Sequence, residues 1–314
     1  MKLKYERKPM QQHISFIRNM VDRGGPVKSE YRQLNSWLRV LNNEIVSGDV
    51  STNDLSAIRE AFGPALGPET MQGFSFQKPH GYNGDFEIID KIYTGHLSPV
   101  PDLVNWDHYF HWHNAPRAVR NRKDYFINLL NQIEKSNCKT DSPIHILNVA
   151  SGPARDLLDF YSSNSNGRMM FDCIEFDPKA IEYATTICSP YLNHINFMNK
   201  NAFKFRTDKR YRLIWSGGLF DYFDDNTFVR LLNRYTSFLE ENGEMVIGNF
   251  STENPTRNYM EIVGDWHLNH RSADRLIALA TSSGIDPKNI RVGQEPEGVN
   301  LFLHIKNGPE FVGM

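Results

Sequence analysis

The sequence predicts an α/β fold in which an open, mostly parallel sheet follows a helical N-terminal part. In residues 1–136 the apolar residues follow helical spacing and no convincing strand occurs. In residues 144–306 short apolar runs alternate with helical segments, which is typical of strands buried on both faces. We therefore expect a helical domain over 1–136 and a sheet domain over 144–306, with Ser136–Pro143 as the linker.

Three amphipathic helices are expected in the helical domain. Glu30–Val46 places its apolar side chains at three- and four-residue spacing. Ser51 is a suitable N-cap for a second helix, which the glycines and prolines of 63–68 bring to an end. Ala118–Ile133 repeats the helical spacing and predicts the third helix.

Strand and helix signals alternate through the sheet domain. The expected strands are Ile144–Val149, Met169–Phe176, Ile195–Met198, Leu213–Trp215 and Met245–Phe250. A helix through Tyr161 should follow the turn at 151–153, and Asp177 should cap a helix that begins at Pro178 and runs to about Cys188. The remaining expectations are helices at Asn226–Glu240, stopped by Asn242-Gly243, and at Ser272–Ser283, and a terminal hairpin of Asn289–Val292 with Val299–Ile305.

Composition excludes several classes of function. The 35 Lys and Arg residues against 37 Asp and Glu give a net charge of −2, which supplies no general basic surface for nucleic acid. Cys138, Cys173 and Cys188 are too few and too scattered for a disulfide framework or a zinc site. No apolar run approaches the ~20 residues that span a bilayer. We expect a reduced, soluble, cytoplasmic protein without metal, membrane span or nucleic-acid partner.

The turn after the first strand is the expected ligand site, because ligands of open parallel sheets bind beyond the carboxyl ends of the strands. Ala150, Ser151 and Gly152 are small enough to let a ligand lie against the backbone. The turn has one glycine where the dinucleotide fingerprint has three, which disfavours a pyrophosphate ligand and favours a nucleoside without phosphates. An ordinary corner between strand and helix is the alternative interpretation.

Polar side chains follow the second and third strands. Glu175 lies 23 residues after Gly152, close to the ~20-residue spacing at which an acid binds a pair of ribose hydroxyls. Asp177 is better explained as a helix N-cap. After the third strand, Asn201-Ala202 places an amide where adenine could be bound, although a polar turn explains Asn201 nearly as well.

These features occur in the order of the class I methyltransferases that depend on S-adenosyl-L-methionine (SAM), and the chain resembles this family over about Ile144–Lys306. Leu213–Phe223 resembles the family's motif beside the methyl group, and Gly243–Phe250 resembles its closing strand. The resemblance implies a Rossmann-like seven-stranded sheet and SAM as cofactor. The cofactor contacts expected from these motifs are Ala150, Ser151, Gly152, Glu175, Phe176, Asn201, Ala202, Ser216 and Gly217. The chain departs from the family in the loop, where the usual glycines are reduced to Gly152.

A narrower resemblance extends into the helical domain. Its segments are Gly81–Glu87, Ala118–Arg122, Gly218–Tyr222 and Met260–Trp266. They are similar to a bacterial group of methyltransferases that make 3-hydroxy fatty acid methyl esters, a quorum-sensing signal. The resemblance implies that the helical domain is a lid and substrate domain. His80–Asp85 should form a shaped loop of this lid, with Tyr82 or Asp85 touching the methionine end of the cofactor.

Methyl transfer from a sulfonium is a direct displacement, so the protein mainly aligns the reactants and excludes water. A carboxylate acceptor is already ionised and needs a cation or a hydrogen-bond donor to hold it. The cations and hydroxyl groups near the motifs are Arg120, Arg122, His270, Arg271, Tyr82, Tyr222 and Tyr259. Of these we take Tyr82, Tyr222 and His270 as catalytic candidates and Arg120 as a cofactor ligand. For Arg120-Asn121-Arg122 the alternative is a solvated helix face, and for His270-Arg271 it is capping and dipole pairing near a helix start.

His108, His111 and His113 lie close together in the chain. Two of them could share a helix face and bind a metal, but no acid or cysteine stands at a defined spacing. We expect an aromatic packing segment here and no metal site. The surrounding aromatic residues suit an apolar substrate pocket and ordinary core packing equally well.

The sequence thus predicts a SAM-dependent methyltransferase of small-molecule biosynthesis, with a carboxylate or hydroxyl as the acceptor. One alternative keeps the fold and cofactor but cyclises SAM with release of methylthioadenosine. A non-catalytic SAM-binding module is the other. Neither the acceptor nor the oligomeric state follows from the sequence.

Overall fold

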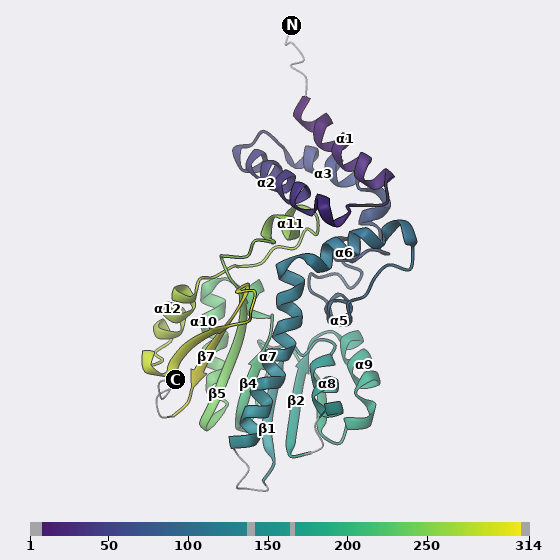
Figure 1. Ribbon diagram of the computed structural model, residues 1–314. Coiled ribbons are helices and arrows are strands. Elements are labelled where there is room, and N and C mark those ends of the chain that lie inside the picture. The colour runs from purple at the N-terminus through teal and green to yellow at the C-terminus, as the bar shows by residue number, and fades with distance from the viewer. Residues whose placement is uncertain (1–7, 137–141, 164–166, 309–314) are drawn as a thin grey trace. The chain divides into compact units, whose positions relative to one another are not determined.

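The computed structural model describes residues 8–136, 142–163 and 167–308 (Figure 1). The chain divides into two compact units, the first formed by residues 1–116 with 255–267 and the second by 117–254 with 268–314. Cys138 and most of the expected linker lie outside the described residues. No helix in the described ranges is long and apolar enough to cross a membrane.

The first unit is helical. Its α-helices are α1 (Lys8–Asp22), α2 (Tyr31–Ser47), α3 (Thr52–Glu60), α4 (Met71–Gln77), α5 (Phe86–Thr94), α6 (Val104–Trp112) and α11 (Arg257–Ile262). Short 3₁₀ helices occur at Lys28–Glu30, Gly63–Leu66 and Pro101–Leu103. The helices predicted at 30–46 and after Ser51 are confirmed, and Ser51 forms a reciprocal capping box with Asp54. α1, α4, α5, α6 and α11 were not predicted.

The second unit contains one seven-stranded sheet. Its strands are β1 (Ile144–Val149), β2 (Met169–Glu175), β3 (Ile195–Asn199), β4 (Tyr211–Ser216), β5 (Leu239–Phe250), β6 (Ile290–Gln294) and β7 (Asn300–Lys306). They lie in the order β3-β2-β1-β4-β5-β7-β6. β1 to β5 are parallel and β7 is antiparallel to both its neighbours. The seven-stranded α/β sheet and the terminal hairpin expected from the sequence are confirmed.

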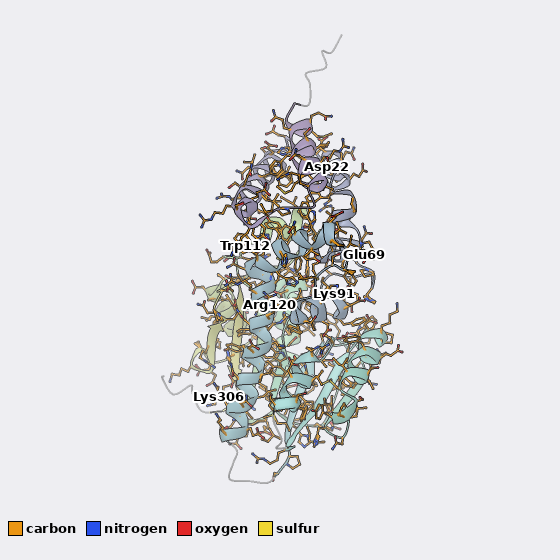
Figure 2. The ribbon with its side chains drawn as sticks, turned by 45° about the vertical axis from the view of Figure 1, so that its right-hand side comes forward. Asp22, Glu69, Lys91, Trp112, Arg120 and Lys306 are labelled. Atoms are coloured by element: carbon orange, nitrogen blue, oxygen red, sulfur yellow. The ribbon has the colours of Figure 1, made fainter. Side chains whose placement is uncertain are left out.

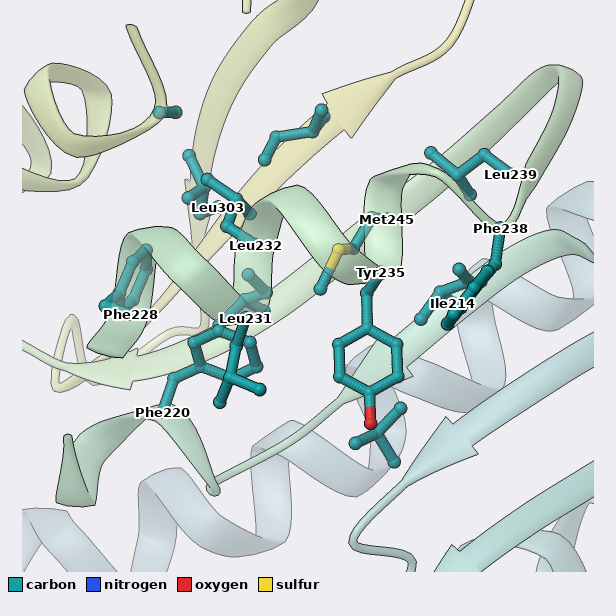
Figure 3. Packing of buried hydrophobic residues seen from close by; sticks show 14 of the residues in the cluster. Ile214, Phe220, Phe228, Leu231, Leu232, Tyr235, Phe238, Leu239, Met245 and Leu303 are labelled. Atoms are coloured by element: carbon teal, nitrogen blue, oxygen red, sulfur yellow. The ribbon is translucent and has the colours of Figure 1, made fainter. Parts of the chain in front are cut away.

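Helices cover both faces of this sheet. They are α7 (Asn114–Ser136), α8 (Arg155–Ser163), α9 (Pro178–Ile187), α10 (Asp225–Thr236) and α12 (Ala273–Ser282), with 3₁₀ turns at Ser189–Tyr191, Phe220–Tyr222 and Pro287–Asn289. Apolar residues of α7, α8 and α9 form a core on one face. On the other face α10 and α12 pack on the strands, and Figure 3 shows Tyr235 of α10 beside Met245 and Ile214 of the sheet.

The boundary between the units differs from the expected one. Residues 117–136 were placed in the helical domain, but they belong to the second unit. The reason is aromatic packing of α7 on the sheet, where the Phe126 ring stacks on Trp215 at 4.5 Å and Tyr125 stacks on Phe302 at 3.9 Å. Residues 255–267 lie within the sequence range of the sheet domain but belong to the helical unit.

The predicted helix Asn226–Glu240 is too long at its end. α10 stops at Thr236, and Leu239 pairs with Tyr211 as the first residue of β5. Asn242 has a φ of 64° and a Cβ on Gly243 would meet the Tyr211 carbonyl oxygen at 2.8 Å, so this pair forms an irregularity within β5. Asn242-Gly243 is compatible both with the end of a helix and with a bulge in a strand. The pairing of β5 with β4 shows that it lies in a strand.

Candidate functional site

β1 ends at Val149, and the loop after it follows a strained path. Ala150, Gly152 and Ala154 have φ angles of 57°, 55° and 52°. Left-handed backbone costs an L residue about 1–2 kcal/mol, and strain of this kind concentrates at ligand sites. Apart from chain neighbours, no atom of the described residues comes within 4 Å of a Cβ built on Gly152. The loop therefore offers an open backbone face at the carboxyl end of β1.

The carboxylate of Glu175, the last residue of β2, lies beside this loop. Its Oε2 accepts a hydrogen bond from the Gly152 N–H at 3.0 Å. Its Oε1 accepts from the N–H groups of Phe176 at 2.7 Å and Asp177 at 3.1 Å. β1 and β2 are neighbouring parallel strands, so their carboxyl ends meet at one edge of the sheet. The structure thus brings together Gly152 and Glu175, as the sequence predicted.

Phe176 and Ser151, two of the predicted cofactor contacts, lie at this same edge of the sheet. The Phe176 side chain is 70% exposed and offers a flat apolar face. The Oγ of Ser151 is buried without a hydrogen-bond partner among the described residues. A buried polar atom left unpaired costs about 1–3 kcal/mol, which a polar ligand group would recover. Asp177 accepts from the Lys179 N–H at 2.9 Å, which confirms its role as the N-cap of α9.

The turn after β3 lies next to the same edge, since the Lys200 N–H donates to the Glu175 carbonyl oxygen at 2.9 Å. Asn201 Oδ1 accepts from the Phe203 N–H at 2.8 Å, as in the polar turn that was the alternative for this residue. The Ala202 carbonyl oxygen accepts from the Tyr235 hydroxyl at 2.9 Å. Binding of adenine by Asn201 and Ala202 stays a prediction.

The residues at the carboxyl end of β4 pack against an arginine of α7. Ser216 is buried and its hydroxyl donates to the Val149 carbonyl oxygen at 3.2 Å, which joins β4 to β1. The carbonyl oxygen of Gly217 accepts from Arg122 Nη1 at 3.0 Å, and a Cβ on Gly218 would lie 2.7 Å from the same nitrogen. The two glycines therefore make room for Arg122, which is only 8% exposed.

Arg120, which the sequence assigned to the cofactor, also belongs to α7 and is labelled in Figure 2. Two residues along a helix turn a side chain by about 200°, so Arg120 and Arg122 point in different directions. Arg120 is half-buried, and burial followed by the charge of Arg117 lowers its pKa, while Glu297 raises it. A role of Arg120 in binding the cofactor stays a prediction. Arg122 is buried, so the alternative of a solvated helix face does not apply to it.

Two buried carboxyl groups are influenced by the charge of Arg122. Burial raises the pKa of Asp156, on α8, to about 6, and that of Asp221, after β4, to about 7. Backbone N–H groups and the charge of Arg122 act in the opposite direction on both. Sequence reasoning did not single out either acid. Carboxyl groups with raised pKa values near strand ends are typical of functional sites.

Of the catalytic candidates in this unit, His270 is half-buried and Tyr222 is 39% exposed. His270 Nε2 lies 3.2 Å from Asn254 Nδ2, and its Nδ1 lies 3.1 Å from the Leu268 carbonyl oxygen. The adjacent Arg271 is buried and is used structurally. Its Nε lies 2.9 Å from Oδ1 of Asp225, which stands at the start of α10.

The other predicted residues lie in the first unit. His80–Asp85 forms a loop between α4 and α5, as expected. Tyr82 is 40% exposed in this loop. Asp85 is buried and caps α5, with its Oδ1 accepting from the N–H groups of Glu87 and Ile88 at 2.9 Å each. Asp85 therefore has a structural role, and contact of Tyr82 or Asp85 with a cofactor stays a prediction.

The three histidines near α6 do not converge. His113 is buried and stacks on the Tyr259 ring at 4.3 Å, and burial lowers its pKa to about 3. His108 is exposed, and His111 Nε2 lies 2.8 Å from the carbonyl oxygen of His96. The predicted aromatic packing is confirmed for His113. Within the described ranges, no three metal-ligating side chains gather in one place.

Two solved structures have folds similar to that of this chain. No family model and no curated protein matches the chain. A Bordetella parapertussis protein described as a possible exported protein aligns with a TM-score of 0.58 and 16% identity, covering 96% of each chain. A candidate O-methyltransferase from Nostoc punctiforme aligns with a TM-score of 0.50 and 12% identity, covering 77% of this chain and 71% of its own. With the strand order, these likenesses show a Rossmann-like α/β fold.

Proposed function

We propose that the chain is a SAM-dependent methyltransferase that binds its cofactor at the carboxyl ends of β1 and β2. The observation that carries the proposal is the strained loop 150–154 with the Glu175 carboxylate 3.0 Å from the Gly152 nitrogen. Strain in this loop needs a reason, and an open backbone face beside a carboxylate is suited to a nucleoside. The fold of the second unit supports the proposal.

The residues at this edge fit SAM. The Glu175 carboxylate can accept from both ribose hydroxyls, and the exposed Phe176 ring can pack on a purine. The unpartnered Oγ of Ser151 is available for a polar group of the ligand. Asn201 and Ala202 are proposed to contact the adenine edge, next to the turn that Lys200 ties to β2.

SAM supplies an electrophilic methyl group when it is bound. The contribution of the chain is to hold the reacting groups in line and to exclude water. Arg122, fixed on the Gly217 carbonyl oxygen, brings positive charge to the exit of β4, where an anionic group would be stabilised. We propose His270 and Tyr222 as the groups that orient the acceptor, with Arg120 as a further cation. A catalytic role for Tyr82 stays a prediction from the sequence.

Cofactor binding can be tested by calorimetry with S-adenosylhomocysteine on the full chain. Glu175→Ala should weaken binding by at least about tenfold, because a hydrogen bond to a charged group contributes about 1.5–3 kcal/mol. Asp177→Ala is the matched control, since it removes a carboxylate two residues away that caps α9. It should bind as the unaltered chain does. Absence of binding heat, or equal affinity of the Glu175→Ala variant, would contradict the proposal.

For the acceptor we propose an oxygen nucleophile of a small molecule, a carboxylate or a hydroxyl. The resemblance of Gly218–Tyr222 and Met260–Trp266 to the enzymes of 3-hydroxy fatty acid methyl esters supports a 3-hydroxy acid. Mass spectrometry after incubation with SAM and 3-hydroxy acids should detect methyl esters and S-adenosylhomocysteine in equal amounts. Release of methylthioadenosine without any acceptor would instead indicate cyclisation of SAM.

A further inference from the structure

The connection between β3 and β4 differs from the other parallel connections of the sheet. α8 joins β1 to β2, α9 joins β2 to β3, and α10 joins β4 to β5. Residues 200–210, which join β3 to β4, contain turns and no helix. Parallel strands are usually linked through a helix that lies on the sheet. Beside this short connection a cavity of about 330 Å³ is open.

The floor of this cavity is apolar, with one carboxylate that is already neutralised. Met198, Phe205 and Tyr211 provide the apolar part. Asp172 accepts from the Lys209 ammonium group at 2.8 Å and from the Tyr211 hydroxyl at 2.9 Å. The charge of Lys209 is therefore balanced within the protein.

The rim of the cavity is positively charged, and no carboxylate among the described residues neutralises this charge. Lys200, Lys204 and Arg206 line it and are exposed. In the described part of the chain, no carboxylate pairs with the ammonium groups of Lys200 or Lys204. Arg206 donates to the carbonyl oxygen of Phe205 at 2.9 Å, which leaves its charge uncompensated. The rim thus carries three positive charges in a chain whose net charge is −2.

α10 adds positive charge on the same side. Burial, followed by the charge of Arg206, lowers the pKa of Arg234, and Arg230 acts in the same direction. Arg206 is therefore near enough to repel the guanidinium group of Arg234. Like charges that repel one another destabilise the folded chain unless an anion neutralises them.

We propose that this cavity binds a small molecule that carries a phosphate group. The phosphate, with about two negative charges at pH 7, would lie on Lys200, Lys204 and Arg206, and the organic part would lie against Met198. The cavity lies at the lower end of the ~300–1,000 Å³ range of small-molecule sites. This site does not depend on the proposed methyltransferase function.

The test is calorimetric titration of the full chain with phenyl phosphate, inorganic phosphate and phenol at low salt. Phenyl phosphate should bind more tightly than inorganic phosphate, and phenol should not bind. The double variant Lys204→Ala/Arg206→Ala should bind phenyl phosphate at least tenfold more weakly. Arg210→Ala is the matched control, because Arg210 belongs to the same connection but does not line the cavity. It should bind as the unaltered chain does.

Three results would overturn the proposal. They are no saturable binding of phenyl phosphate, equal loss in the double variant and the Arg210→Ala control, and tight binding of heparin without binding of phenyl phosphate. The last result would indicate a surface for a polyanion instead. Affinity for S-adenosylhomocysteine, measured on the same variants, should be unchanged, which separates this site from the proposed cofactor site. Circular dichroism of each variant checks that it is folded.

Discussion

Asp221→Asn should reduce the dependence of stability on pH. The Asp221 side chain is 2% exposed, and burial raises its pKa to about 7 from the ordinary 3.8. The N–H of Phe250, which donates to its Oδ1 at 2.6 Å, and the charges of Arg122 and Arg271 only partly oppose this. An asparagine keeps an oxygen for the Phe250 N–H and cannot ionise.

The size of the effect follows from the two pKa values. A carboxyl whose pKa is higher in the folded state stabilises that state while it is protonated. The difference of about three pKa units, at about 1.36 kcal/mol each, corresponds to about 4 kcal/mol. This contribution is complete below about pH 4 and is lost as the pH rises through about 7. The free energy of unfolding of the variant, minus that of the unaltered chain, should therefore rise with pH.

Urea denaturation followed by tryptophan fluorescence measures this difference. Between about pH 5 and pH 8.5 it should rise by about 3 kcal/mol for Asp221→Asn. Asp224→Asn is the control, because Asp224 lies three residues away and the bond from the Thr227 N–H lowers its pKa. The control should show no such rise. A difference that does not change with pH for Asp221→Asn would refute the assignment of a buried, protonated carboxyl.

Two further predictions concern glycines. Gly73→Ala should lower the free energy of unfolding by about 3 kcal/mol or more, because its Cβ would lie 1.9 Å from the backbone oxygen of Gly67. Gly48→Ala, which has open space around it, should lower the free energy of unfolding by only about 1–2 kcal/mol. Equal losses for the two variants in urea denaturation would contradict this prediction. Gly293→Ala should cost about 1–3 kcal/mol, because its Cβ would lie 2.6 Å from the Tyr125 hydroxyl. In a double-mutant cycle Tyr125→Phe should remove most of that cost, and simple additivity would show that the hydroxyl is not the obstacle.

Sequence patterns were most informative for the parallel strands. Ile144–Val149 was predicted with its observed limits, because a strand buried on both faces is a continuous apolar run. The meeting of Gly152 with Glu175 was also predictable, since neighbouring parallel strands end at one edge. The short helices α4 and α6 were missed because their aromatic-rich sequences are buried from several sides and lack a clear polar face.

Tertiary contacts determined what the sequence pattern left open. Leu239 fits the apolar stripe of α10, and only its pairing with Tyr211 places it in β5. Arg120 and Arg122 are equivalent in the sequence, and the packing of α7 on the sheet decides which one contacts Gly217. Asp221 stands in a motif that was recognised, but its protonation depends on burial, which the sequence did not reveal.

A crystal structure of the chain with S-adenosylhomocysteine would show whether the nucleoside binds at Glu175. We expect the two ribose hydroxyls within hydrogen-bond distance of the Glu175 carboxylate and the nucleoside against the loop 150–154. A ligand bound elsewhere, with Glu175 still holding only the N–H groups of Gly152, Phe176 and Asp177, would contradict it.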